Sequence, residues 1–190
     1  LTRARFKGRD NRLISLWMIQ AGLTKVAIFN PEKQNIHAGE FLYKKNILIV
    51  RGSFRPATLV NQDMIRASNE QFRNEPEVES QQCFLLSEIT LKNLQAQGEV
   101  DEKDFLDRAD LLAELNQTVV VSNCEEYIEL IKYLSDYKVQ KLGLVVGVRQ
   151  LLDLITEKYY NNMDGQLLAA FGEVFNKNVR LYVYPSLQEG

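Results

Sequence analysis

Short, nearly uniform apolar runs alternate with amphipathic segments from residue 47 onward, and this alternation restricts the possible folds more than any other feature of the chain. Runs rich in β-branched residues are typical of strands that are buried on both faces of a sheet. The predicted strands are 47–50, 83–86, 118–121, 142–146 and 179–184. Helices are predicted at 59–72, 105–115, 125–134, 151–159 and 166–175. Strands separated by helices indicate a parallel sheet, and these strands are too few for a closed barrel. The sequence therefore predicts an α/β fold with an open, doubly wound, mostly parallel sheet.

A different pattern precedes these strands. Leu13, Leu16 and Ile19 recur at helical spacing within 12–22, and 26–29 is a short apolar strand closed by an Asn-Pro turn. We expect residues 1–45 to form an N-terminal helix and strand, either an appendage or the tail of a preceding domain, and residues 46–190 to form the α/β domain. Because the chain opens on leucine and not on methionine, we expect it to be a piece of a longer protein.

The composition excludes several classes of protein. With 23 Lys and Arg against 25 Asp and Glu, the formal charge is −2, so there is no basic excess for broad binding of nucleic acid. No stretch approaches the roughly 18 apolar residues that a membrane span needs, and 2 cysteines are too few for a disulfide framework. We therefore expect a cytoplasmic protein whose partner is a small molecule and neither nucleic acid nor a membrane. A homo-oligomer is left open.

Several side chains with reactive or charged groups have plain structural interpretations. The only histidine, His37, excludes multi-histidine metal sites and is expected to be a solvated loop residue. Cys83 is expected to be a core thiol, and Cys124 to be structural. The charged residues of 104–110, which include Asp104 and Arg108, are expected to form a solvated helix face.

The search for chemistry starts just after each strand, because ligands of open parallel sheets bind beyond the carboxyl ends of the strands. In the first such loop, Gly52 directly follows a buried strand, and a helix is predicted to begin a few residues later. Backbone N–H groups in such a bend, with the helix N-terminus, can bind a phosphate group. The alternative is an ordinary connection whose polar residues only cap the helix. Glu88, Thr90, Lys92 and Asn93 follow the next strand, where they could contact a ribose or a base, or form a turn and cap.

The residues of this first loop resemble the signature of the nucleotidylyltransferase superfamily, G-[ST]-F-x-P-x-[HT]-x-x-H. The form in nicotinamide or nicotinate mononucleotide adenylyltransferases is the most similar. The positions that match are Gly52, Ser53, Phe54, Pro56 and Thr58. Asn61 falls where the family has its final histidine, and Arg55 where it has Asp or Asn. A later G-x-D signature resembles 147–149, with Arg149 in place of Asp. The resemblance covers roughly residues 46–190.

The resemblance implies a Rossmann-like fold of nucleotidylyltransferase type and a role in NAD biosynthesis. The implied reaction is attack by a mononucleotide phosphate on the α-phosphate of ATP, with release of pyrophosphate. The implied cofactors are ATP and Mg²⁺, the ion arriving with the nucleotide and not held by a protein metal site. The implied catalytic residues are Arg55, Thr58 and Asn61. The implied nucleotide-binding residues are Gly52, Ser53, Phe54, Glu88, Gly147 and Arg149.

The departures from the family pattern bear on activity. Asn61 offers only a neutral amide donor, whereas a protonated histidine donates a hydrogen bond roughly twice as strong. Loss of one preorganised donor can cost about 100- to 1000-fold in rate, although Arg55 could compensate by placing positive charge beside the phosphates. We therefore expect adenylyl transfer that is weak or lost. The alternative is a non-catalytic regulatory or assembly module that retains the fold.

Overall fold

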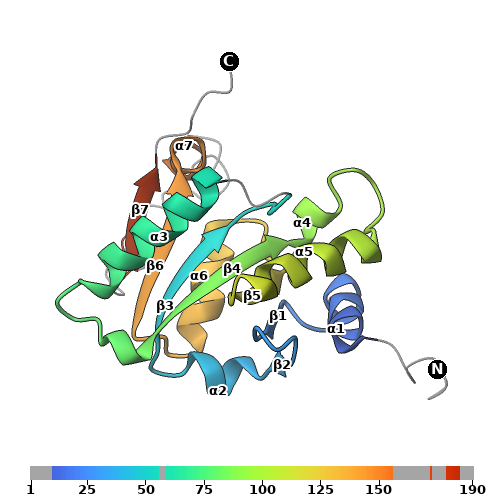
Figure 1. Ribbon diagram of the computed structural model, residues 1–190, viewed down its shortest axis with the longest axis horizontal. Coiled ribbons are helices and arrows are strands. Elements are labelled where there is room, and N and C mark those ends of the chain that lie inside the picture. The colour runs from blue at the N-terminus through green and yellow to red at the C-terminus, as the bar shows by residue number, and fades with distance from the viewer. Residues whose placement is uncertain (1–9, 56–58, 156–171, 173–178, 185–190) are drawn as a thin grey trace.

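The computed structural model describes residues 10–55, 59–155, 172 and 179–184, and a seven-stranded sheet with helices packed against it forms its centre (Figure 1). The strands are β1 (Val26–Phe29), β2 (Asn35–Ile36), β3 (Asn46–Arg51), β4 (Cys83–Thr90), β5 (Thr118–Ser122), β6 (Lys141–Gly147) and β7 (Val179–Tyr184). Their order across the sheet is β2-β1-β5-β4-β3-β6-β7. Strands β3 to β7 are parallel, whereas β1 is antiparallel to both of its neighbours. The α/β class and the mostly parallel sheet are therefore confirmed, in an arrangement compatible with Rossmann-like folds.

The helices are α1 (Asn11–Gln20), α2 (Ala38–Leu42), α3 (Leu59–Arg73), α4 (Leu91–Leu94), α5 (Glu102–Glu114), α6 (Tyr127–Asp136) and α7 (Val148–Ile155). The predicted strands are all present, and β4 continues beyond its predicted end to Thr90. The short elements β2, α2 and α4 were not predicted. The helix predicted over 151–159 corresponds to α7, but its predicted end lies outside the described residues. The helix predicted over 166–175 lies outside them too, apart from residue 172.

Buried hydrophobic side chains form two separate clusters, and no residue of a strand belongs to both. Because alternate residues of a strand face opposite sides of a sheet, neighbouring residues of β3 enter different clusters. Val50 packs with Phe72 of α3 and Phe105 of α5, whereas Ile49 packs with Leu130 of α6. Figure 1 shows α3 and α6 on opposite faces of the sheet. Both faces of the parallel strands are therefore covered, which explains the apolar runs in their sequences.

The described residues that precede β3 belong to the same sheet and the same core. Val26 of β1 is paired with Ser122 of β5, and Phe29 with Val119. Leu16 and Ile19 of α1 are fully buried in the cluster that contains Val50. The helix and strand expected within residues 1–45 are thus both present, and they extend the parallel sheet at its β5 edge.

Gly143 of β6 allows α3 to approach the sheet closely. A Cβ at this position would lie 2.7 Å from Cδ1 of Leu48 and 3.0 Å from the ring of Phe72, both closer than side chains normally approach. Any larger residue would push α3 or β3 away. Elsewhere in the core, Cys83 and Cys124 are buried free thiols, as expected. None of the helices within the described ranges has the length and apolar content needed to cross a bilayer.

Candidate functional site

The direction in which successive strands are added to the sheet reverses at the centre of its parallel part. The first parallel strand, β3, lies between β4 on one side and β6 on the other, and the later strands continue outward on each side. In sheets of this kind ligands bind at the carboxyl ends of the two strands where the order reverses. The loop after β3, which begins at Gly52, and the segment after β6, which begins at Val148, meet this condition. The strand order thus selects the same loop as the sequence.

The bend at Gly52 is shaped by its own aromatic residue. Phe54 has a φ of 51°, in the left-handed region, and its ring is 2% exposed within the core. A Cβ on Gly52 would lie 3.2 Å from this ring, which explains the glycine by packing. The Gly52 N–H donates to the Glu88 carbonyl at 3.0 Å and so continues the pairing of β3 with β4. In this conformation the predicted phosphate donor at Gly52 is therefore engaged within the sheet, while Ser53 is exposed.

Arg55 is held by α5. Its Nη2 lies 2.6 Å from Oδ2 of Asp104, its Nε donates to Oδ1 at 2.7 Å, and its Nη1 donates to Gln97 at 3.2 Å. The hydrogen bond from Arg55 lowers the pKa of the Asp104 carboxyl, and burial opposes this only in part. The positive charge predicted to lie beside the phosphates is thus paired with a carboxylate in this conformation.

A second arginine anchors the same loop from within the protein. Arg108 is 4% exposed, and its guanidinium lies 2.5 Å from Asp104, 3.1 Å from the Ser53 carbonyl and 2.8 Å from Oδ1 of Asn93. Among the residues that the structure describes, the buried Nε of Arg108 has no hydrogen-bond partner. The expectation of a solvated charged face on this helix is therefore wrong for Arg108. The reason is that the loop after β3 covers it and supplies polar partners that the helix sequence does not reveal.

We expect the Asp104→Asn variant to have a lower free energy of unfolding than the wild type at neutral pH. This difference in free energy should become smaller in acid. A carboxyl group whose folded pKa is lowered stabilises the protein above its unfolded pKa, which is about 3.9, and this contribution is lost as the pH falls through the folded value. Urea denaturation between neutral pH and about pH 3 measures the difference. Asp107→Asn, in the exposed pair with Lys103, is the control and should change stability little at any pH. A difference that is constant down to the lowest pH would contradict the role of the Asp104 charge.

An ion-pair network lies beneath the carboxyl edge, and sequence reasoning missed its central residue, Arg51. Nε and Nη2 of Arg51 donate to the two carboxylate oxygens of Glu88 at 2.9 and 3.1 Å. Ser122 donates to the same carboxylate at 2.6 Å. Glu88 is fully buried, and the Arg51 side chain is 15% exposed. Sequence reasoning assigned Glu88 to nucleotide binding, whereas here both of its oxygens are engaged by protein groups. The available signal was positional, because Arg51 and Glu88 occupy paired register positions on β3 and β4.

Arg51 also fixes the loop after β5. Its guanidinium donates to the carbonyls of Cys124 and Glu125 at 2.9 and 2.8 Å and lies 4.3 Å from the ring centre of Tyr127. Burial lowers the pKa of Arg51, but the hydrogen bonds and charge of Glu88 raise it overall. Burial, with the nearby charge of Glu88, raises the pKa of the Cys124 thiol to about 11. Cys124 is therefore a neutral thiol at physiological pH, which fits its predicted structural role.

A cavity of about 310 Å³ opens at the carboxyl edge, over β4 and β5. Its polar lining includes Thr90, Gln95 and Asn123, and Lys92 forms an ion pair with Glu125 beside it. Two of the residues expected near a ribose or base, Thr90 and Lys92, therefore line it. Of the other two, Asn93 is bonded to Arg108 and Glu88 to Ser122 in the cavity wall. The strand order reverses between β3 and β6, so the cavity over β4 and β5 is displaced from that point by one strand.

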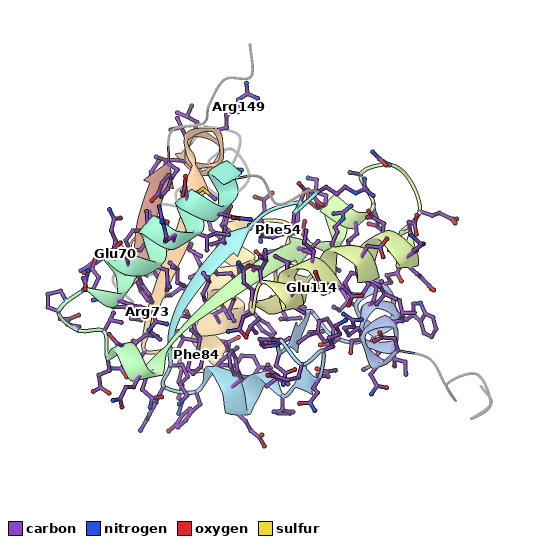
Figure 2. All side chains as sticks on the ribbon, in the orientation of Figure 1. Phe54, Glu70, Arg73, Phe84, Glu114 and Arg149 are labelled. Atoms are coloured by element: carbon purple, nitrogen blue, oxygen red, sulfur yellow. The ribbon has the colours of Figure 1, made fainter. Side chains whose placement is uncertain are left out.

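The remaining predicted site residues are dispersed or lie outside the description. Arg149 is exposed, and Figure 2 shows its side chain at the periphery of the molecule, well separated from Phe54. The side chain of Gln150 lies against Gly147. Thr58 lies outside the described residues, and so does the side chain of Asn61, whose backbone belongs to α3.

The arrangement combines a loop at the reversal of strand order, two arginines that share one carboxylate, and a polar cavity beside them. It could bind the phosphate and the polar remainder of one ligand. Within the described part of the chain, no three His, Cys, Asp or Glu side chains are grouped so that they could hold a metal ion. A scan of the chain against models of known protein families finds no match, and a search of the curated proteins finds no similar protein.

Proposed function

We propose that this chain binds a nucleoside phosphate at the carboxyl edge of its sheet, with the phosphates at the loop after β3. The observation that carries the proposal is the central position of β3 between β4 and β6, which puts this loop at the reversal of strand order. The proposal includes a doubly wound sheet. It is supported by the placement of α3 and α5 with one hydrophobic cluster and of α6 with the other.

The groups around the loop suit the different parts of such a ligand. The N-terminal end of α3, which follows the loop, would attract phosphate through its free N–H groups and dipole. Thr90, Gln95 and Asn123 offer hydroxyl and amide groups to a sugar or base in the neighbouring cavity. Arg55 could reach a phosphate only by leaving Asp104, so ligand binding would exchange one anionic partner for another.

The proposed reaction is adenylyl transfer from ATP to a mononucleotide. A phosphate oxygen of the acceptor forms a bond to the α-phosphorus of ATP, the bond from that phosphorus to the bridging oxygen of pyrophosphate breaks, and pyrophosphate leaves with its electrons. The protein has to align the two phosphates and stabilise the developing negative charge. Asn61 would supply a neutral donor there, which makes the expected rate low. The Mg²⁺ that accompanies ATP would be bound by the phosphates themselves.

A second candidate is a nucleotide-responsive module without catalysis. The pairing of Arg55 with Asp104 and the engagement of the Gly52 N–H with Glu88 favour it, because both take a predicted phosphate donor away from the ligand. This candidate shares the binding site and differs only in the absence of turnover.

We expect ATP to raise the melting temperature of the protein and adenosine to have little effect, because the phosphates are proposed to supply most of the binding. At a ligand concentration about 100 times Kd, the stabilisation is about 2.7 kcal/mol. Thermal denaturation measures the shift, with Lys103→Gln on the exposed face of α5 as the control that retains it. The absence of a shift with ATP would overturn the binding proposal.

Turnover separates the two candidates. Pyrophosphate release is measured with Mg-ATP and nicotinate mononucleotide, for the wild type and for Asn61→His. Release that rises with histidine at this position supports adenylyl transfer, because a charge-assisted donor is restored. Binding without release in either protein supports the non-catalytic module.

A further inference from the structure

A second cavity, of about 360 Å³, lies at the β1–β2 edge of the sheet. It is bounded by β1, β2, the start of α2 and one side of α6, with α1 contributing Ser15 and Met18. Ligand pockets in proteins begin at about 300 Å³, and a dry cavity of about 150 Å³ already accepts benzene. The space is therefore sufficient for a single substituted ring.

The cavity exists because β2 covers only part of the edge of β1. Ile28 and Phe29 of β1 are paired with β2, whereas the pairing does not extend to Val26 or Ala27. Val26, Ala27 and Ile28 all contribute to the cavity wall. In the described part of the sheet no further strand lies beside them, and their apolar residues line the cavity at this point.

Much of the wall is apolar or aromatic, and it contains no Lys, Arg, Asp or Glu. Val26, Ile28 and Ile36 form one side, and Tyr133 and Tyr137 of α6 form another. The two tyrosine rings lie 5.0 Å apart between centroids and are tilted by 56°. A neutral planar ring meets favourable surfaces here, whereas a charged ligand would lose hydration and would find no Lys, Arg, Asp or Glu side chain in the lining to offset the loss.

The polar groups of the cavity are mostly paired with one another. Asn35 donates to the Ser15 hydroxyl at 2.7 Å, Thr24 donates to the Val26 carbonyl at 3.2 Å, and the Tyr133 hydroxyl donates to that of Tyr137 at 3.3 Å. Each of these pairs is satisfied without a ligand. They therefore shape the cavity and leave the choice of ligand to the remaining polar group.

That remaining group is His37. It precedes α2 as the N-cap residue, yet its side chain makes no capping hydrogen bond. Its ring is packed over Gly39, where a Cβ would lie 3.3 Å from Cε1 and 3.4 Å from Nδ1. Within the described part of the chain the imidazole nitrogens have no hydrogen-bond partner. The expectation of a solvated loop histidine is confirmed, because His37 is exposed, and its side chain also lines the open cavity.

We propose that this cavity binds a small neutral aromatic molecule that carries one hydroxyl group, with the ring against Tyr133 and the β1 edge and the hydroxyl hydrogen-bonded to His37. A phenolic hydroxyl can donate to the imidazole or accept from it, so the pairing does not depend on the tautomer. The proposal is independent of the nucleotide site, since none of the residues it uses contributes to that site.

The test uses 4-methylphenol, toluene and benzoate as probes. Because His37 is the only histidine in the chain, its Cε1–H resonance in ¹³C-histidine-labelled protein reports on this cavity alone. We expect 4-methylphenol to shift this resonance saturably and to bind about 3- to 10-fold more tightly than toluene, as one net hydrogen bond between neutral groups allows. Benzoate should bind more weakly than either. No saturable shift with 4-methylphenol would overturn the proposal.

Two variants and a matched control exclude a merely structural effect. Ala38→Phe fills the cavity and should abolish binding, whereas Ala113→Phe introduces the same ring at a half-buried site on α5 outside the cavity and should not. His37→Phe should retain toluene but lose the preference for 4-methylphenol, which ligand-observed NMR measures. Melting temperatures establish that each variant is folded. Undiminished binding to Ala38→Phe, or an unchanged preference in His37→Phe, would contradict the assignment.

Discussion

We expect the Glu88→Ala variant to lose about 3–5 kcal/mol in its free energy of unfolding, the usual cost of removing one partner from a buried ion pair. The Glu88 carboxylate is fully buried and is the counter-charge of Arg51. Without it, the Arg51 guanidinium at the end of β3 keeps two backbone carbonyls and a tyrosine ring as its described contacts, and none of these carries a negative charge. Urea denaturation at neutral pH measures the loss.

Two further variants test the cause of this loss. Asp107→Ala breaks the exposed pair with Lys103 and should cost less than about 1 kcal/mol, because exposed ion pairs contribute little. Replacing both buried partners, as Arg51→Met with Glu88→Leu, should recover much of the stability, since no uncompensated charge is left. A double variant as unstable as Glu88→Ala would contradict the electrostatic explanation, and so would a single variant with wild-type stability.

We expect the Phe105→Ala variant to be destabilised by about 3–5 kcal/mol, the range for large-to-small changes of a buried aromatic residue. Phe105 is fully buried, and its ring centre lies 6.5 Å from that of Phe29. Because Phe29 belongs to β1 and Phe105 to α5, the pair joins the N-terminal strand to the parallel part of the structure. In a chain of this size the loss lowers the melting temperature by about 2–4 °C for each kcal/mol.

The number of unfolding transitions tests whether β1 and α5 belong to one cooperative unit. If β1 and α5 unfold together, calorimetry of Phe105→Ala should give one transition at a lower temperature. Phe84→Ala, at a partly exposed position of β4, is the matched control and should cost less. Two transitions, of which only one moves, would show that the N-terminal strand and the parallel sheet are separate units.

The parallel strands could be predicted because a strand that is buried on both faces has a recognisable apolar run in its own sequence. Each is a mainly apolar run, and several are rich in β-branched residues; this pattern needs no knowledge of the partner strands. No such local pattern indicates the strand order or the antiparallel pairing of β1. Both depend on contacts such as that of Val26 with Ser122, which are far apart in the sequence.

The end of β4 shows where the pattern fails. Its prediction ends at residue 86 because Ser87 and Glu88 are polar, yet the strand continues and buries both completely. They are buried at tolerable cost because Gln117 hydrogen-bonds to Ser87 and Arg51 pairs with Glu88. A sequence shows the polar residue but not the partner that allows its burial.

The position of the candidate site could be predicted from the sequence, but the partners of its charged side chains could not. The loop after β3 follows from Gly52 at the end of an apolar strand. That Arg55 meets Asp104, and that Arg108 reaches the Ser53 carbonyl, depends on how α5 is placed against this loop. Helical periodicity predicts which face of α5 packs against the core. It does not indicate that a loop covers the charged residues beside that face.

The pairing of β1 with β5 has a consequence for the order of assembly during synthesis. A ribosome releases the N-terminal strand long before it releases the segment that receives it, which ends at Ser122. Until then β1 can pair with β2 and lie against α1, but its other edge has no partner strand, so that edge is open to chaperones or to mispairing with other chains. β1 is thus made well before its partner β5, and slowing translation ahead of residue 122 should prolong this vulnerable period.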